Sequence, residues 1–333
     1  MPRRLDATEP AGRERAIDEA AEALRAGGLV AFPTETVYGL GARARDEAAV
    51  ARLYALKGRP RRHPLITHVA DALELEAWAA SVPDAAQLLA EAFLPGPLTL
   101  VLRAHASAPA GVTGGADTVA LRVPGHPLAL ALLRALGEGV AAPSANRFGR
   151  ISPTRAQHVL DEFEAVPEGT GGELLVLDGG PCSVGLESTI VDLSGDRPRI
   201  LRPGAISAQQ VAALVGPLSQ DAGPRPPAPG DQPRHYAPDV PTRLVEGAEL
   251  ERAPSDVAVL ALDPPPRERP LSAAPWLGLG DDPVAYGREL YAALRVLEAG
   301  RPRAIWIERV PGREAWRAVE DRLERASGHE EAT

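Results

Sequence analysis

The sequence predicts an α/β protein that has a mixed sheet, followed by a linker and a smaller α/β domain. Early in the chain, apolar runs typical of strands alternate with helical runs. Later, up to residue 204, the expected strands follow one another directly. Residues 216–241 are rich in proline and glycine and have no periodicity, as in a linker. Beyond them a strand, a helix, a strand and a helix are expected. We therefore divide the chain into residues 1–215, 216–241 and 242–333.

Length and composition agree with this division. The 333 residues correspond to about two domains. The net charge of −9 argues against an extended nucleic-acid surface, although it leaves room for a local basic cleft. Cys182 is the only cysteine, so no internal disulfide forms, which fits a cytoplasmic protein. We expect no signal peptide and no membrane span.

The elements of the first domain are predicted from apolar spacing. Residues 14–26 place Ile17 and Leu24 on one helical face, and residues 50–58 read as a helix that ends at Gly58. Two more helices are expected at 84–93 and 127–137. The expected strands are 29–37, 64–70, 98–104, 118–124, 139–144, 174–180, 188–194 and 198–204.

The elements of the last domain are fewer. Residues 256–263 and 304–310 are expected to be strands, and residues 284–299 and 313–326 are expected to be helices. This order is typical of a small α/β domain.

Several common motifs for nucleotide and metal binding are missing. The sequence contains no GxxxxGK[ST] loop, no GxGxxG fingerprint, no HExxH, no paired cysteines and no GxSxG. If the protein binds a nucleotide, it must therefore do so through a different binding motif.

Two residue types occur only once. Lys57 is the only lysine among 36 basic residues, and Asn146 is the only asparagine. Lys57 and Arg59 stand at a predicted helix end, either as a solvated basic turn or as an anion site. An arginine would serve equally well on a solvated turn, so the isolated lysine favours the anion site.

The loop PSANRFGRISPT, residues 143–154, presents Ser144, Asn146 and Ser152 directly after a strand. Such loops often present hydroxyl and backbone N–H groups to ligands. An ordinary turn, in which serine and asparagine bond their own backbone, explains the pattern equally well.

Polar residues interrupt other apolar runs. Thr34, Glu35 and Thr36 break the strand in FPTETVYGLGA, which a β-bulge would also explain. Arg122 stands within an apolar strand, where it is either exposed or paired with an anion. His68 is compatible with a ligand or, more commonly, with a satisfied core histidine. We expect the Cys182 thiol to be inert.

Taken together, these segments resemble a known family. PTETVYGLGA, KGRP, HPLITHV, PGPLTLVL, ALRVPGHP, APSANRFGRISPT, GLESTIVDL and RPGAIS occur in this order, as in the YrdC-like L-threonylcarbamoyladenylate synthases. The resemblance covers about residues 14–210. PRHYAP, residues 233–238, resembles the longer two-domain form.

The resemblance implies a fold and a reaction. The fold would be a twisted, open mixed sheet with a basic concave face, and the last domain would be a small Rossmann-like α/β domain. The enzyme would be a nucleotidyltransferase that makes L-threonylcarbamoyl-AMP and pyrophosphate from L-threonine, bicarbonate and ATP with Mg²⁺. The product would pass to the machinery that modifies the tRNA adenosine next to the anticodon.

The resemblance also implies site residues. L-Threonine would be held by Thr36, His68, Arg122, Ala142 and Ser188. Lys57 and Arg59 would be catalytic, and PGDQPRHYAP would form a lid over the site. His63 stands where many members have asparagine, which weakens its assignment. The ATP site would comprise Lys57, Arg59, His63, Thr118, Ser144, Asn146, Ser152, Arg202, His235 and Tyr236.

Two other functions remain open at this point. One is an RNA-binding or ribosome-maturation protein that uses the same basic cleft, and the absence of aromatic stacking motifs counts against it. The other is a regulatory binder of threonine or nucleotide. The related hydrogenase-maturation proteins carry zinc-finger cysteines, which a single cysteine excludes. The metal ligands and the general base are not identified.

Overall fold

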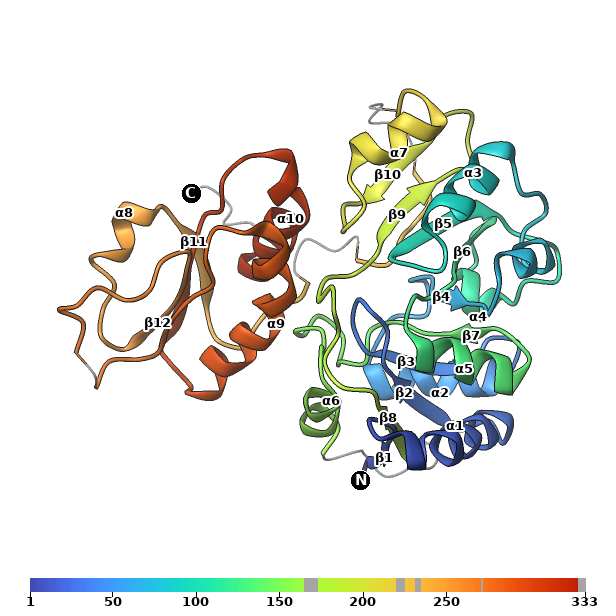
Figure 1. Cartoon of the computed structure of the whole chain (residues 1–333), viewed down its shortest axis with the longest axis horizontal. Helices are drawn as coiled ribbons and strands as arrows, with labels where there is room; N and C mark the ends of the chain where they lie inside the picture. The colour runs from blue at the N-terminus through green and yellow to red at the C-terminus, as the bar shows by residue number, and fades with distance from the viewer. Residues whose placement is uncertain (165–172, 220–224, 231–234, 271, 329–333) are drawn as a thin grey trace. The chain divides into compact units, whose positions relative to one another are not determined.

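The chain forms two compact units, each with its own sheet (Figure 1). The computed structural model describes residues 1–164, 173–219, 225–230, 235–270 and 272–328. The first unit comprises Met1–Arg147, Pro153–Ser183 and Glu187–Asp231, and the second comprises Phe148–Ser152, Val184–Leu186 and Gln232–Thr333. Each unit is therefore built from stretches that are separate in the sequence.

Within the described residues of the first unit, ten strands form one mixed sheet, as predicted. Their order is β1-β8-β2-β3-β7-β4-β6-β5-β9-β10. Both parallel pairs, such as β4 with β6, and antiparallel pairs, such as β5 with β6, occur. The bounds are β1 Arg3–Asp6, β2 Leu29–Phe32, β3 Gly39–Arg43, β4 Ile66–His68, β5 Leu98–Arg103, β6 Thr118–Arg122, β7 Val140–Ala141, β8 Leu174–Asp178, β9 Thr189–Asp192 and β10 Arg199–Arg202.

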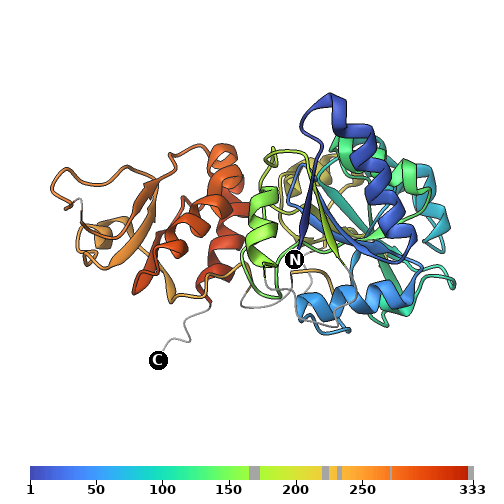
Figure 2. The same cartoon turned by 90° about the horizontal axis from the view of Figure 1, so that it is seen from below.

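Helices cover both faces of this sheet. Val30 and Phe32 of β2 pack in the core beneath α1 and α5, whereas Leu29 and Ala31 pack in the core that includes α2 and α3. This division follows from the alternation of side chains along a strand. Helices α1 and α5 lie side by side (Figure 1, Figure 2). The helices are α1 Pro10–Arg25, α2 Glu47–Lys57, α3 Asp84–Phe93, α4 Ala110–Thr113, α5 Pro127–Leu136, α6 Ala156–Glu162 and α7 Ala208–Val215, with a 3₁₀ helix at Ala72–Ala77.

Helix α2 positions the lysine. The Asp46 side chain caps its first turn by accepting a hydrogen bond from the Ala49 amide at 2.9 Å. Gly58 ends the helix with a left-handed φ of 64°, a conformation that glycine adopts without strain. The predicted end of this helix is therefore confirmed, and Lys57 lies in its last turn.

Residues 33–38 form the turn that joins β2 to β3. The two strands pair antiparallel, with Phe32 opposite Gly39. Thr34 orders the turn, because its hydroxyl donates to the Val37 carbonyl at 2.6 Å and accepts from the Thr36 amide at 3.2 Å. The polar triplet at 34–36 therefore belongs to a hairpin turn and not to a β-bulge.

The second unit contains a parallel sheet with the strand order β11-β14-β12-β13. Helix α9 packs on β12, and α10 packs on β11 and on α9. Two expected strands and two expected helices are present, although a short 3₁₀ turn, Glu314–Trp316, precedes the last helix. The bounds are β11 Thr242–Val245, α8 Gly247–Leu250, β12 Val257–Ala261, β13 Trp276–Gly278, α9 Pro283–Ala299, β14 Ala304–Glu308 and α10 Arg317–Ser327.

The proposed linker lies partly outside the described residues, because 220–224 and 231–234 are not described. The second of these ranges, 231–234, belongs to the suggested lid at residues 229–238. Ala228 is buried with Val101 and Leu201 in the first unit. Across the described ranges, no helix is long and apolar enough to cross a membrane.

Candidate functional site

Lys57 joins helix α2 to the loop that follows β7. Its side chain is buried, and Nζ donates to the Ser144 carbonyl at 2.5 Å and to the Asn146 carbonyl. Burial, followed by the charge of Arg59, lowers the pKa of the lysine well below its ordinary value. The Asn146 side chain in turn donates to the Arg147 carbonyl at 2.7 Å. The structure thus brings the two rare residues together.

This contact gives a physical reason for a lysine. An ammonium group is compact and donates in three directions from the end of a slender stem, so it reaches two carbonyls and retains one further N–H. A planar guanidinium would need more space in a site where the lysine is only 3% exposed. The loop is therefore tied to α2 by a group that can also face an anion.

Arg59 orders the segment that follows α2. Its Nη2 donates to the Pro64 carbonyl at 3.0 Å, and the Tyr54 hydroxyl donates to the His63 carbonyl at 2.7 Å. Arg59 is buried and His63 is half-buried. The backbone of residues 63–64 is therefore held in place next to a buried cation.

Arg122 forms a buried ion pair with Glu35. Its Nη2 lies 2.6 Å from Glu35 Oε1, and its Nε donates to the Gly96 carbonyl at 3.2 Å. Glu35 Oε2 accepts from the Gly125 amide at 2.9 Å. Of the two alternatives for an arginine within this strand, exposure or pairing with an anion, the structure shows the pairing.

His68 lies beside Arg122, because β4 and β6 pair in the register that places these two residues opposite each other. Burial, followed by the Arg122 charge, lowers the pKa of the imidazole to about 3, so the ring is neutral at neutral pH. Within the described part of the chain, no group forms a hydrogen bond with the buried Nδ1 atom. A buried polar atom of this kind is suited to a ligand.

Ser188 and Arg202 connect the two predicted halves of the site. Arg202 donates from Nε to the Ser188 carbonyl at 3.0 Å and from Nη2 to the Ser188 hydroxyl at 3.1 Å. That hydroxyl also lies 2.7 Å from Thr99 Oγ1. A predicted threonine ligand and a predicted ATP ligand therefore touch each other.

The three remaining predicted residues of the first unit are also buried. Thr36 Oγ1 lies 2.8 Å from Thr34 Oγ1 in the hairpin turn. Thr118 and Arg122 are four positions apart on β6 and so point to the same face of the sheet. The Ala142 amide donates to the Ile66 carbonyl at 2.9 Å.

The other three predicted ATP residues belong to the second unit. The His235 amide donates to the Arg325 carbonyl at 3.1 Å, and its ring lies 6.4 Å from that of Phe148. Tyr236 has a left-handed φ of 61°, and its ring lies 5.7 Å from that of Tyr291. Ser152 is fully buried.

Cations dominate the buried charges of the predicted site. Lys57, Arg59, Arg122 and Arg202 are each less than 9% exposed, and His68 is neutral. Buried cations with donors on separate segments are suited to carboxylates and phosphates. No group of three or more histidine, cysteine, aspartate or glutamate side chains is arranged to hold a metal in the described ranges.

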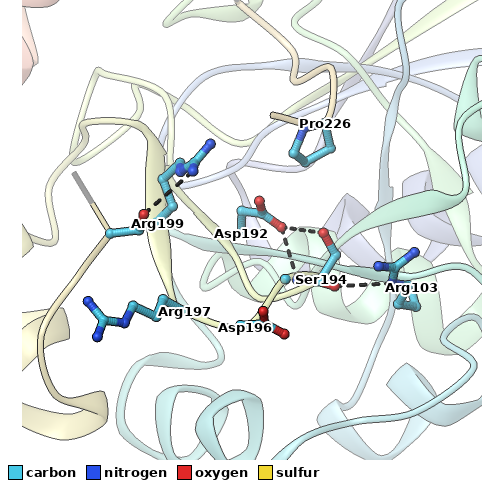
Figure 3. Close-up of a pocket in the computed structure, with 9 residues that line it drawn as sticks. Arg103, Asp192, Ser194, Asp196, Arg197, Arg199 and Pro226 are labelled. Atoms are coloured by element: carbon cyan, nitrogen blue, oxygen red, sulfur yellow. Dashed lines mark hydrogen bonds between the residues drawn. The ribbon is translucent and has the colours of Figure 1, made fainter. Parts of the chain in front are cut away.

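A pocket of about 450 Å³ lies elsewhere on the first unit, where β9 ends and β10 begins (Figure 3). The Asp192 carboxylate accepts hydrogen bonds from the amide and the hydroxyl of Ser194, and Arg103 donates to the Ser194 carbonyl. None of the predicted ligands lines this pocket.

Three polar residues that contact the predicted ligands were not themselves predicted as site residues. Glu35 pairs with Arg122, Thr99 contacts Ser188, and Thr34 orders the hairpin turn. Glu35 and Thr34 were visible as a polar interruption of an apolar run, and Thr99 as a lone hydroxyl within LTLVL. Their partners could not be read from the sequence.

Comparison with known proteins identifies the family. A family described as telomere recombination matches residues 22–204, and one described as threonylcarbamoyl-AMP synthase, C-terminal domain, matches residues 206–328. The threonylcarbamoyl-AMP synthase of Bacillus subtilis is 38% identical and aligns over 94% of this chain and 93% of its own. That of Pyrococcus abyssi is 39% identical over 93% of both chains.

A solved structure agrees with these relatives. The structure of P. abyssi Sua5 complexed with L-threonine matches with a TM-score of 0.86 and 37% identity, over 98% of this chain and 97% of that chain. Because the family models and these relatives together cover nearly its whole length, the chain belongs to the threonylcarbamoyl-AMP synthase family.

Proposed function

We propose that this chain forms L-threonylcarbamoyl-AMP and pyrophosphate from L-threonine, bicarbonate and ATP, which makes it a nucleotidyltransferase. The observation that carries the proposal is the set of four buried cations, Lys57, Arg59, Arg122 and Arg202, in a member of this family. L-Threonine has a carboxylate, bicarbonate is an anion and ATP carries phosphates, and such a site stabilises these negative charges.

We assign L-threonine to Arg122 and its neighbours. The Arg122 guanidinium would bind the substrate carboxylate, and the orphaned Nδ1 of His68 and the Ser188 hydroxyl would contact its polar groups. Thr36 and the backbone at Ala142 complete this assignment. The match to a structure that contains L-threonine supports it.

We assign ATP to the Lys57–Asn146 loop and to Arg202. Lys57, Arg59, Ser144 and Asn146 would face the phosphates, and Arg202 would neutralise charge beside Ser188. The remaining proposed ATP contacts are His63, Thr118, Ser152, His235 and Tyr236. Mg²⁺ would enter with the ATP phosphates, where it needs few protein ligands.

The chemistry has two bond-forming steps. The neutral threonine amine attacks the carbon of bicarbonate, and loss of water leaves a carbamate. A carbamate oxygen then attacks the α-phosphorus of ATP, and pyrophosphate leaves. Positioning of the two reactants and stabilisation of the developing negative charge supply the catalysis, with Lys57 and Arg59 as the catalytic cations.

The product is a reactive mixed anhydride, so water must be excluded once it forms. Residues 229–238 are proposed as the lid, and the product would pass to the machinery that modifies tRNA. We propose that this takes place in the cytoplasm, where ATP and tRNA meet.

Pyrophosphate release tests the proposal. ATP, Mg²⁺ and bicarbonate would be incubated with the full chain, with or without L-threonine. We expect release only when L-threonine is present. Pyrophosphate release that does not depend on L-threonine would contradict the proposal. Salt-dependent tRNA binding without ATP turnover would favour an RNA-binding role instead.

A further inference from the structure

Glu35 is a buried carboxylate that the proposed reaction does not use. It lies in the hairpin turn between Thr34 and Thr36, and it is only 8% exposed. Both of its oxygens are occupied: Oε1 accepts from Arg122 Nη2 at 2.6 Å, and Oε2 accepts from the Gly125 amide at 2.9 Å. Two segments from other parts of the chain therefore fix the orientation of this carboxylate.

The contacts of Arg122 occupy one edge of its guanidinium. Nε donates to the Gly96 carbonyl, and Nη2 donates to Glu35. Nε and Nη2 form the side-on edge of the planar group. Among the described residues, none accepts a hydrogen bond from Nη1. The end-on edge, made by Nη1 and the second proton of Nη2, is left for another acceptor.

That remaining edge matches a carboxylate. Two parallel N–H groups bind the two oxygens of a carboxylate in a bidentate arrangement, which requires the guanidinium plane to be held at one angle. Gly96 and Glu35 hold that plane from one side. Glu35 also balances the buried charge of Arg122 before any substrate arrives.

We propose that Glu35 is a positioning residue that holds the side-on edge of Arg122 and so presents its end-on edge to the α-carboxylate of the amino-acid substrate. This inference rests on the proposed function, and in particular on L-threonine as the amino acid. It gives Glu35 a role in substrate selection: the enzyme distinguishes an amino acid from the corresponding amino alcohol through an arginine that Glu35 orients.

The test compares the binding of L-threonine with that of L-threoninol, which lacks the carboxylate. Isothermal titration calorimetry with the full wild-type chain should show L-threonine binding about 10- to 100-fold more tightly. In Glu35→Gln this ratio should fall to within about threefold, because the amide cannot serve both Arg122 and the Gly125 amide as an acceptor. A general loss of folding would weaken both ligands equally and would leave the ratio unchanged.

A matched control is available in the same unit. Glu138 forms an ion pair with Arg43 at 2.9 Å, outside the predicted site, so Glu138→Gln should retain the wild-type ratio. If Glu35→Gln does not fold, Glu35→Asp keeps the charge on a shorter side chain and should also lower the ratio. A wild-type ratio in the Glu35 variant that folds would overturn the inference.

Failure of the proposed function would look different. Wild-type protein that binds neither ligand would remove L-threonine as the substrate, and Glu35 would lose its role with it. Wild-type protein that binds both ligands equally, yet releases pyrophosphate only with L-threonine, would overturn the Glu35 inference alone.

Discussion

Lys57 Nζ donates to two backbone carbonyls of the loop that carries Ser144 and Asn146. At the scale of single residues, this contact accounts for a lysine in a chain whose other basic residues are arginines. The rarity of Lys57 and Asn146 was the signal that linked them, although nothing in the sequence showed that the lysine bonds the asparagine's own carbonyl.

Lys57→Arg should therefore impair the enzyme even though it keeps the charge. The larger guanidinium would displace the loop, and we expect kcat to fall by about 100-fold or more and the free energy of unfolding to fall by about 1 to 3 kcal/mol. Steady-state pyrophosphate assays and urea unfolding measure the two effects. The exposed neighbour Arg61 offers a control, since Arg61→Lys should change neither. Full activity of Lys57→Arg would refute this role.

His68 should make stability depend on pH. Its pKa is about 3 in the folded chain against an ordinary value near 6.5, so the unfolded chain binds the extra proton between these values. Its contribution is complete above about pH 6.5 and is lost as the pH falls towards 3. When the pH falls from 7 to 4.5, the free energy of unfolding should decrease in both proteins. The decrease should be about 2 to 3 kcal/mol smaller in His68→Gln than in wild type. Equal losses in urea titrations would contradict the buried, neutral imidazole.

The candidate site could be predicted only in part at this scale. Lys57, Arg59 and Arg122 stood out as cations in unusual settings, and their burial and contacts agree with that interpretation. Glu35 did not stand out as the partner of Arg122, because the two residues are 87 positions apart and meet only when the hairpin turn approaches β6. A pairing of this kind depends on the sheet order, which local patterns do not contain.

At the scale of elements, the strongest apolar patterns gave the most accurate predictions. The helix predicted at 84–93 coincides with α3, and the end of α2 at Gly58 follows from the left-handed glycine. Strands β1, β11 and β13 were missed because each presents few buried side chains, so the alternation that marks a strand is weak.

Gly204, which follows β10, should be required for the Ser188–Arg202 contact. A Cβ at this position would lie 2.4 Å from the Thr189 amide nitrogen and 2.7 Å from the Ser188 carbonyl carbon, so the backbone would have to move. We expect Gly204→Ala to lower the free energy of unfolding by about 1 to 3 kcal/mol and to raise KM.

Gly195 provides the matched control, because a Cβ there meets nothing within 4 Å. Gly195→Ala should stay within about 0.5 kcal/mol of wild type in the same unfolding assay. If the two alanine variants behaved alike, the close approach at Gly204 would not limit the site.

At the scale of the whole molecule, the second unit contains short segments from the middle of the chain as well as its C-terminal part. It includes residues 148–152, which follow Asn146 directly. Arg150 forms ion pairs with Asp239 and Glu298, and the Gly149 carbonyl accepts from the Ala237 amide at 3.0 Å. The sequence could not show that a segment of the serine–asparagine loop is held by residues that follow it by 88 to 148 positions, from Ala237 to Glu298.

Removal of residues 217–333 should therefore lower threonine-dependent pyrophosphate release by at least about tenfold, because the loop at 148–152 loses these partners. In the full chain, Arg150→Ala should cause a smaller loss in the same assay. A truncated chain with full activity would show that neither the lid nor the second unit is needed for the reaction.

The central claim is that one site joins L-threonine, bicarbonate and ATP. The most direct measurement is mass spectrometry of the AMP adduct formed from isotopically labelled bicarbonate. We predict an adduct that contains threonine and one labelled carbon, in wild type but not in Arg122→Ala. An adduct of threonine and AMP without the label would mean that the threonine carboxylate itself attacks ATP, and it would contradict the proposed reaction.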